Sequence, residues 1–250
     1  MNAVAAPLLQ ARDLKPRHDD GQAFEHPLSI EVSSGEIVCL VGPNGGGKTA
    51  FLRALAALDK PASGALKVLG KDALKLDTDA WRALRLRAAY VGEGAPLLSI
   101  VNGLINVTLP AMYHRLGTAP QVQAAAQDIL TFLDYPGRQD LLPAYLNQHE
   151  RLLLAIARCL MLSPELMFLD EPFHMTDSAC REREAAVYHK LTTERGLALL
   201  IATHNLGFVR RHADKIVFLH PDWVGCFDGW KPFAASRQAE VKGFLDTDPR

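Results

Sequence analysis

The chain has 250 residues, a length that suits one large α/β domain, and 48% of them are hydrophobic, which is enough for a sizeable core. Its 27 basic and 28 acidic residues nearly cancel, giving a formal net charge of −1. Because a nucleic-acid-binding protein usually carries a basic surplus, we expect no nucleic-acid partner.

The N-terminal and apolar segments predict neither export nor membrane insertion. The apolar runs are short and interrupted by charges, so no transmembrane helix is expected. Residues 1–20 lack the basic start and long apolar core of a signal peptide. The cysteines are scattered without metal-ligand spacing, which favours buried free thiols in a reducing cytoplasm: Cys39, Cys159, Cys180 and Cys226.

A phosphate-binding loop is the first strong motif along the chain. The run "IVCLV" (37–41) has the continuous apolar pattern of a strand buried on both faces, and "AFLRALAAL" (50–58) has helical spacing. Between them lies the pattern G-x-x-x-x-G-K-T over residues 42–49. Glycines let backbone N–H groups converge on phosphate oxygens, and the following helix turns its positive end to the same anion. We expect Lys48 to reach the β- and γ-phosphates and the Thr49 hydroxyl to bind Mg²⁺.

Two later strands end in candidate catalytic groups. "ELMFLDEP" is an apolar strand that ends in Asp170 and Glu171, at the sheet edge where ligands bind in open α/β sheets. Asp170 is expected to hold Mg²⁺, and Glu171 to orient or polarise the attacking water. "GLALLIATHN" predicts another buried strand, which ends at His204, a candidate partner of the γ-phosphate or the nucleophilic water.

Together these motifs resemble the ATPase subunit of ABC transporters, and the match covers nearly the whole chain. "VGPNGGGKT" resembles Walker A, "LMFLDEP" resembles Walker B with its catalytic glutamate, "HMTD" lies where the D-loop places Asp177, and "ATHN" resembles the switch-histidine strand. The resemblance implies that Lys48, Glu171 and His204 are catalytic. It implies nucleotide contacts along the whole loop: Gly42, Pro43, Asn44, Gly45, Gly46, Gly47, Lys48, Thr49 and Ala50.

The resemblance also implies a fold and an assembly. The fold class is α/β: a P-loop NTPase with a RecA-like core, an antiparallel β region near the N-terminus and a helical subdomain from about residue 95 to 165. One nucleotide-binding domain is expected to span residues 1–250. Two such domains would pack head to tail, with ATP between one P-loop and the opposing signature motif. ATP would close the dimer and hydrolysis reopen it, which moves the helices of a membrane permease.

The signature motif departs from the family pattern. The family's LSGGQ falls on residues 146–150, "LNQHE", where the serine and both glycines are replaced. Asn147 is a good helix N-cap, and Glu150 three residues later fits a capping box, so the helix start is still specified. Asn147 also keeps an N–H donor near the serine's place, and His149 could carry positive charge towards a partner's phosphate. Two interpretations stay open: reduced or altered nucleotide contact, and unusual but full function.

Three smaller departures concern the nucleotide bound by the chain's own P-loop. The family's Q-loop glutamine aligns with Glu93, which can still ligate Mg²⁺ but donates no hydrogen bond unless protonated. Ala50 stands where the family usually has a second hydroxyl for the α-phosphate. His18 occupies the place of the adenine-stacking aromatic and offers less area than Tyr. These differences predict modest nucleotide affinity.

The departures bear on which partners the chain has. Its own P-loop groups are intact, whereas the segment that it lends to a second ATPase subunit is altered. A heterodimer explains this simply, and a homodimer would carry two compromised sites. Either dimer is expected to bind an integral membrane permease, as a peripheral protein on the cytoplasmic face of the inner (plasma) membrane.

The transported cargo is less strongly indicated. Residues 94–114 are similar to the segment after the Q-loop in lipid-transport ATPases of the maintenance-of-lipid-asymmetry (Mla) group. Lipoprotein or small hydrophobic export is the second interpretation. A nucleotide-binding regulatory or structural subunit with little turnover is a different class, against which the retained Glu171 argues. A soluble ABC protein outside transport usually has a second cassette or a coiled-coil insertion, and this chain has neither.

Overall fold

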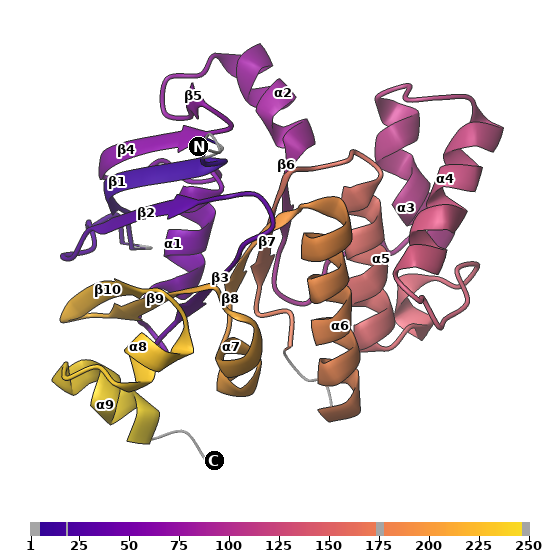
Figure 1. Cartoon of the computed structure of the whole chain (residues 1–250). Coiled ribbons are helices and arrows are strands. Elements are labelled where there is room, and N and C mark those ends of the chain that lie inside the picture. The colour runs from indigo at the N-terminus through magenta and orange to yellow at the C-terminus, as the bar shows by residue number, and fades with distance from the viewer. Residues whose placement is uncertain (1–5, 19, 174–177, 247–250) are drawn as a thin grey trace, which may run out of the picture.

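The computed structural model describes residues 6–18, 20–173 and 178–246, and in it two β-sheets and a set of helices share one core (Figure 1). Five strands of the larger sheet are parallel, in the order β9-β3-β8-β7-β6, and β10 pairs antiparallel with β9 at one edge. These strands are β3 (Ile37–Val41), β6 (Ala88–Val91), β7 (Leu166–Asp170), β8 (Ala198–Ala202), β9 (Lys215–His220) and β10 (Trp223–Phe227).

The smaller sheet is antiparallel and lies near the N-terminus, as predicted. Its order is β2-β1-β4-β5, with β1 (Leu9–Lys15), β2 (Leu28–Val32), β4 (Ser63–Val68) and β5 (Lys71–Asp72). A bulge in β1 shifts its register with both neighbours. The combination of this sheet with the parallel sheet confirms the predicted α/β fold class.

The central strands of the parallel sheet, β3, β7 and β8, are buried on both faces because nearly all of their residues are apolar. Val38 and Leu40 of β3 pack into one hydrophobic cluster, with α1 (Lys48–Leu55) and the antiparallel sheet. Cys39 and Val41 point to the opposite cluster, which the remaining long helices cover. Every residue of β3, β7 and β8 is buried, so the three strands that carry the motifs are fixed within a rigid core.

Most of the predicted helical region lies together at one end of the molecule (Figure 1). It contains α3 (Gly103–Tyr113), α4 (Ala119–Phe132), the 3₁₀ turn η1 (Pro143–Tyr145) and α5 (Gln148–Leu160), and α5 packs against α3, α4 and β6. The other helices are α2 (Thr78–Arg87), α6 (Ser178–Arg195), α7 (Leu206–His212), α8 (Trp230–Ala234) and α9 (Ala239–Asp246). No helix in the described ranges is long and apolar enough to cross a bilayer.

The cysteines are all free, but the prediction that they are buried is wrong for one of them. Cys39 is buried in β3, and Cys159 and Cys180 are half-buried. Cys226 is exposed because it lies on the edge strand β10, which has a neighbour on one side only.

Candidate functional site

The loop between β3 and α1 is shaped by glycines that no other residue could replace at the same backbone path. A Cβ on Gly42 would lie 2.0 Å from the carbonyl oxygen of Leu219 on β9. Gly47 has φ 87°, in the left-handed region, and a Cβ there would lie 2.4 Å from the ring of Phe24. The loop is therefore pressed between the sheet edge and the N-terminal segment, and it leads directly into the first turn of α1.

Lys48 is the first residue of α1 and folds back across this loop. Its buried Nζ donates to the carbonyl oxygens of Gly42 at 3.1 Å and Pro43 at 3.2 Å. Burial lowers the pKa of Lys48, although Glu171 and Asp170 oppose this shift. The ammonium thus lies inside the curve of the loop, at the place where a phosphate group would be surrounded by backbone N–H groups.

Asp170 ends β7 and is held by two hydroxyl groups. The Thr49 hydroxyl donates to Oδ1 at 3.1 Å, and the Tyr90 hydroxyl donates to Oδ2 at 2.9 Å. Burial raises the pKa of Asp170, whereas both hydrogen bonds lower it. Tyr90 was not foreseen from the sequence, because it lies on β6 and reaches Asp170 only through the β6–β7 pairing.

Glu171 and His204 meet at the ends of β7 and β8. Glu171 has φ 46°, a strained value for a residue other than glycine, and its N–H donates to the carbonyl of Ala202 at 2.9 Å. Burial raises the pKa of Glu171 to about 7, with a smaller opposing effect from Lys48. His204 lies against the carboxylate: its backbone N–H donates to Oε2 at 3.3 Å, and its Nε2 lies 3.3 Å from Oε1.

These groups face one open cleft of about 760 Å³. It is lined by Arg17, His18, Phe24, Asn44, Gly45, Gly47, Lys48, Thr49, Ala50, Arg53, Asp59, Glu93, Glu171 and His204. Most of the predicted nucleotide-binding residues are thereby brought together, and Gly42, Pro43 and Gly46 form the loop without lining the cleft. Sequence reasoning missed Arg17, Phe24, Arg53 and Asp59. Arg53 lies on α1 four residues after Thr49, on the same face of the helix, a spacing that could have drawn attention to it.

His18 has an aromatic neighbour that supports its predicted role. Its ring stacks on that of Phe24, with ring centroids 3.6 Å apart and planes inclined by 20°. Phe24 in turn contacts Phe51 of α1 edge-on, at 5.2 Å between centroids. The exposed His18 is therefore supported from the core on one side, in an arrangement that suits stacking on a flat ligand.

The charges of the cleft fit a divalent cation. Burial raises the pKa of both Asp170 and Glu171, and Glu93 adds a smaller electrostatic effect in the same direction. Among the described residues, no three His, Cys, Asp or Glu side chains converge as a complete ligand set. A metal held by Thr49, Asp170 and Glu93 would therefore need further oxygen ligands from phosphate or water, which is how Mg²⁺ is usually bound.

The altered signature segment lies outside this cleft, and it is partly as predicted. Asn147 caps α5: its side chain accepts from the N–H of Glu150 at 2.9 Å, and the Glu150 carboxylate accepts from the N–H of Asn147 at 2.8 Å. The predicted capping box is thus confirmed.

The side chain of His149 differs from its expected position. It is buried, and its Nδ1 lies 3.1 Å from Oε1 of the buried Glu184 on α6. The ring therefore faces the inside of its own chain rather than a partner's phosphate, because the Glu184 carboxylate provides a polar partner there. Asp177, the predicted D-loop residue, lies outside the described residues.

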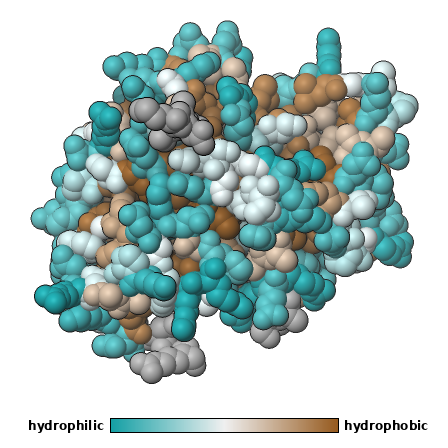
Figure 2. All heavy atoms as spheres, in the orientation of Figure 1, coloured by the Kyte–Doolittle hydropathy of each residue, from teal (hydrophilic) through white to brown (hydrophobic). Residues whose placement is uncertain are grey.

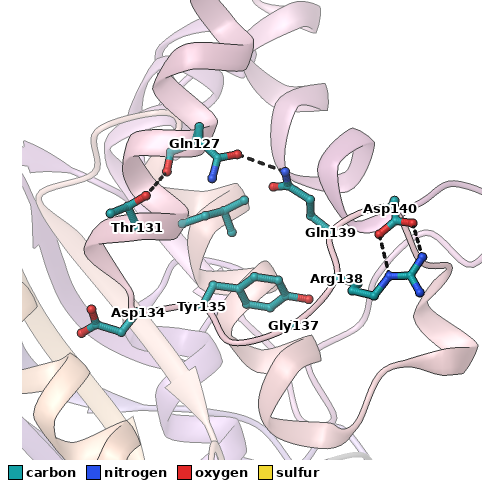
Figure 3. Close-up of a pocket in the computed structure, with 9 residues that line it drawn as sticks. Gln127, Thr131, Asp134, Tyr135, Gly137, Arg138, Gln139 and Asp140 are labelled. Atoms are coloured by element: carbon teal, nitrogen blue, oxygen red, sulfur yellow. Dashed lines mark hydrogen bonds and ion pairs between the residues drawn. The ribbon is translucent and has the colours of Figure 1, made fainter.

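A second cleft, of about 570 Å³, lies between α4 and the loop that leads to η1 (Figure 3). Two pairs of its polar side chains contact each other: Gln139 donates to Gln127 at 3.0 Å, and Arg138 pairs with Asp140 at 2.7 Å. None of the residues predicted from the sequence to bind nucleotide or metal lines it. The chemistry indicated by the motifs therefore belongs to the P-loop cleft.

Comparisons with known proteins agree with this geometry. A family model described as ABC transporter matches residues 26–174. The lipoprotein-releasing system ATP-binding protein LolD of Novosphingobium aromaticivorans is 35% identical over 222 residues, which cover 87% of this chain and 98% of that protein. The methionine import ATP-binding protein MetN of Brucella abortus is 27% identical over 245 residues, which cover 97% of this chain. The chain spans 66% of the length of that relative.

Solved structures show the same fold. The ATP-binding cassette MJ0796, in a dimeric post-hydrolysis state bound to ADP and Pi, aligns with a TM-score of 0.79 at 23% identity, covering 88% of this chain and 98% of that one. The cbiO1 protein of Clostridium perfringens aligns with a TM-score of 0.82 at 20% identity, covering 92% of each chain. The family model and the LolD match together show that the chain belongs to the ABC transporter family, among its ATP-binding subunits.

Proposed function

We propose that this protein binds ATP with Mg²⁺ and hydrolyses it to power a membrane transporter. The observation that carries this proposal is the convergence of Lys48, the Thr49–Asp170 pair and the Glu171–His204 pair on one cleft at the P-loop. We propose also that the whole chain acts as one nucleotide-binding domain. A regulatory subunit with little turnover is the alternative, and nothing in such a role would require the half-buried Glu171 beside His204.

The residues divide the chemistry between them. Lys48 exchanges its bonds to loop carbonyls for bonds to the β- and γ-phosphates, and the loop N–H groups hold the same oxygens. Thr49, Asp170 and Glu93 are the groups that would hold Mg²⁺, which when bound neutralises phosphate charge. Glu171 accepts a hydrogen bond from the attacking water and polarises it, and His204 orients that carboxylate and contacts the γ-phosphate. His18 stacks on the adenine.

A second ATPase subunit would complete the nucleotide site. Residues 146–150 would approach the nucleotide of that partner through Asn147 and the N-terminal turn of α5, because the ring of His149 is engaged within its own chain. We propose a pair in which this chain contributes the stronger P-loop and the weaker signature segment. A heterodimer would contain one copy of this weaker signature segment, and a homodimer would contain two copies.

An exposed apolar surface suits a permease partner. Large hydrophobic side chains are exposed on α3, on the segments at both ends of α3 and on the segment before α5: Leu98, Ile100, Ile105, Leu109, Met112, Tyr113, Leu116, Leu142 and Tyr145. Ile100 is 86% exposed and Tyr145 is 74% exposed. Figure 2 shows brown atoms at the upper right, where Figure 1 places α3 and α4. We propose that a permease docks here, which holds the chain at the cytoplasmic face of the membrane as a peripheral subunit.

We propose a lipid as the cargo, on the resemblance of residues 94–114 to lipid-transport ATPases. The LolD relative, whose name gives lipoprotein release, supports the second candidate, a lipoprotein. Both cargoes carry acyl chains in a membrane, and a reconstituted complex with labelled phospholipid or labelled lipoprotein distinguishes them.

The test is ATP turnover by the complex isolated from its native membrane through a tag on this chain. Native mass spectrometry of the same sample counts the ATPase subunits and identifies the membrane partner. We expect Mg²⁺-dependent hydrolysis that is lost in Glu171→Gln. A stable complex with bound ATP and no hydrolysis would contradict the proposal and favour the regulatory alternative.

A further inference from the structure

His149 and Glu184 form a buried polar contact that the proposed ATP chemistry does not use. His149 is 7% exposed and Glu184 is 1% exposed, and Nδ1 and Oε1 are 3.1 Å apart. A polar group is seldom buried this deeply without a hydrogen-bond partner, because its removal from water costs free energy. The two residues are 35 positions apart and lie on different helices, α5 and α6, so their contact joins two elements of the fold.

The contact lies at the first turn of α5, which is the signature segment. His149 is the second residue of that helix, after the Asn147 cap. The Glu184 carboxylate thus lies near a helix N-terminus, whose partial positive charge favours it. On α6 the next turn carries Tyr188, which is fully buried and whose pKa is raised by burial and further by Glu184. The carboxylate is therefore enclosed by apolar surface on one side and by the start of α5 on the other.

A second polar contact joins the same two parts of the molecule. Lys190, also on α6, donates to the carbonyl oxygen of Phe132 at 2.7 Å and lies 3.3 Å from Asp134, at the end of α4. Figure 3 shows Asp134 at this point. Arg195 extends the contact, with its guanidinium 4.2 Å from the centroid of the Phe132 ring. Helix α6 therefore holds the helical region at two places, one buried and one exposed.

We infer that the His149–Glu184 contact is a positioning pair, which fixes the first turn of α5 against α6 and so sets how residues 146–150 meet the nucleotide of a partner ATPase. The inference rests on the proposed ATPase function. In place of glycines that leave the segment free to approach a phosphate, this chain has a side chain that ties the segment to its own core. His149 acts through the backbone and Asn147, and it does not touch the nucleotide.

The test compares variants of the full chain in its complex. His149→Ala and Glu184→Ala each remove the contact. Glu184→Gln keeps the volume and can donate its amide N–H to Nδ1 of His149, so it serves as the conservative variant. His189→Ala and Glu194→Ala are matched controls, because both residues are exposed on the same helix. Two quantities are measured: amide hydrogen exchange in the peptide that covers residues 148–152, and kcat and KM for ATP.

We expect the two contact-removing variants to exchange faster in that peptide and to lose on the order of 10- to 100-fold in kcat, as misplaced groups do, with KM for ATP within about threefold. KM is spared because the P-loop cleft is untouched. The double variant should lose less kcat than the product of the two single losses, because both changes remove the same contact. Glu184→Gln should keep most of the kcat, and both controls should match the wild type.

Two results would overturn the inference. One is unchanged exchange at residues 148–152 in His149→Ala, and the other is an equal loss of kcat in Glu184→Gln and Glu184→Ala. If one alanine variant fails to fold, the other still decides, because each removes the same contact and is followed by the same two measurements. Absence of turnover in the wild-type complex would contradict the proposed function, and hydrogen exchange would still test the contact.

Discussion

The P-loop cleft and the signature segment differ in whether their polar side chains have partners within the chain. In the cleft, burial raises the pKa of Asp170 and Glu171, that of Glu171 to about 7, and Glu93 adds a smaller effect of the same sign. At the start of α5, each polar side chain finds its partner inside the chain: Asn147 with Glu150, and His149 with Glu184. A bound cation would stabilise the charged form of the cleft carboxylates. The polar side chains at the start of α5 already have partners within the chain.

The difference indicates where ligand-binding energy is available. Groups that repel one another in the free protein gain most when phosphate and a divalent cation arrive, because binding removes the repulsion. Groups already satisfied gain little from a new partner and must first break an existing contact. We therefore expect the P-loop cleft to contribute more binding free energy to its own nucleotide than the signature segment contributes to the nucleotide of a partner subunit.

The largest expected effect comes from breaking the cleft at Lys48. Lys48→Ala removes the ammonium inside the loop and should lower kcat/KM of the complex by on the order of 10³-fold or more, as loss of preorganised charge stabilisation does. Lys67→Ala on the exposed side of β4 is the matched control and should have no effect. ATP hydrolysis by the assembled complex is the measurement. Turnover of Lys48→Ala within tenfold of the wild type would contradict a role for Lys48 in ATP hydrolysis.

Glu171→Gln should abolish turnover while keeping ATP binding, since the amide cannot accept a proton from water. In the wild type, kcat/KM should rise with pH up to about 7 as the carboxylate of the free enzyme ionises. An ATP-binding assay and a pH profile of turnover measure both effects. A wild-type profile that is flat between pH 5.5 and 8 would contradict the assigned pKa.

The same raised pKa has a consequence for stability. The pKa of Glu171 is about 7 in the folded chain and near 4.5 when unfolded, so the folded state binds more protons between these values. Its contribution to stability is full below pH 4.5 and is lost as pH rises through 7. Glu171→Gln should therefore melt at a higher temperature than the wild type at pH 8, and the difference should shrink at pH 5. Thermal denaturation at the two pH values decides this.

The comparison also shows what the sequence could and could not reveal. Lys48, Thr49, Asp170 and Glu171 were predictable because each lies within a local strand-to-loop pattern that fixes its place at the sheet edge. Tyr90 was not, since it meets Asp170 only after β6 pairs with β7. The burial of His149 was also unforeseen, because the Glu184 that attracts it is distant in sequence. Local motifs predict the groups, and tertiary pairing decides where isolated side chains point.

The signature segment can be tested by restoring glycine and serine in two steps. In a complex with two copies of this chain, Asn147→Ser with Gln148→Gly should raise turnover on the order of tenfold, because a cap is kept and a flexible donor is gained. Adding His149→Gly should cancel that gain and lower the melting temperature, because the buried contact between His149 and Glu184, which joins α5 to α6, is lost. Turnover and melting curves of both variants are compared. Higher turnover in the triple variant than in the double would contradict the expected order.

A smaller effect is expected at the base-stacking position. His18→Ala removes the ring that stacks on Phe24 and should raise KM for ATP about tenfold with little change in kcat, in line with about 1–3 kcal/mol for stacking on a base. His26→Ala, at a half-buried histidine near the N-terminus that does not line the cleft, is the control. ATP titrations measure the effect. A fall in kcat at unchanged KM would show that His18 acts on the chemistry instead.

The smallest effect concerns Tyr90, whose hydroxyl donates to Asp170 at 2.9 Å. Tyr90→Phe keeps the ring but removes one of the two hydrogen bonds that lower the pKa of Asp170. The carboxylate then competes less well for a cation, so the Mg²⁺ concentration for half-maximal turnover should rise about two- to fivefold, the equivalent of one modest hydrogen bond. Turnover at saturating Mg²⁺ should stay near the wild-type value, because no group that touches ATP has changed. An unchanged Mg²⁺ requirement would mean that Thr49 alone suffices to orient Asp170, and that the cleft is less dependent on its tertiary contacts than the comparison with the signature segment implies.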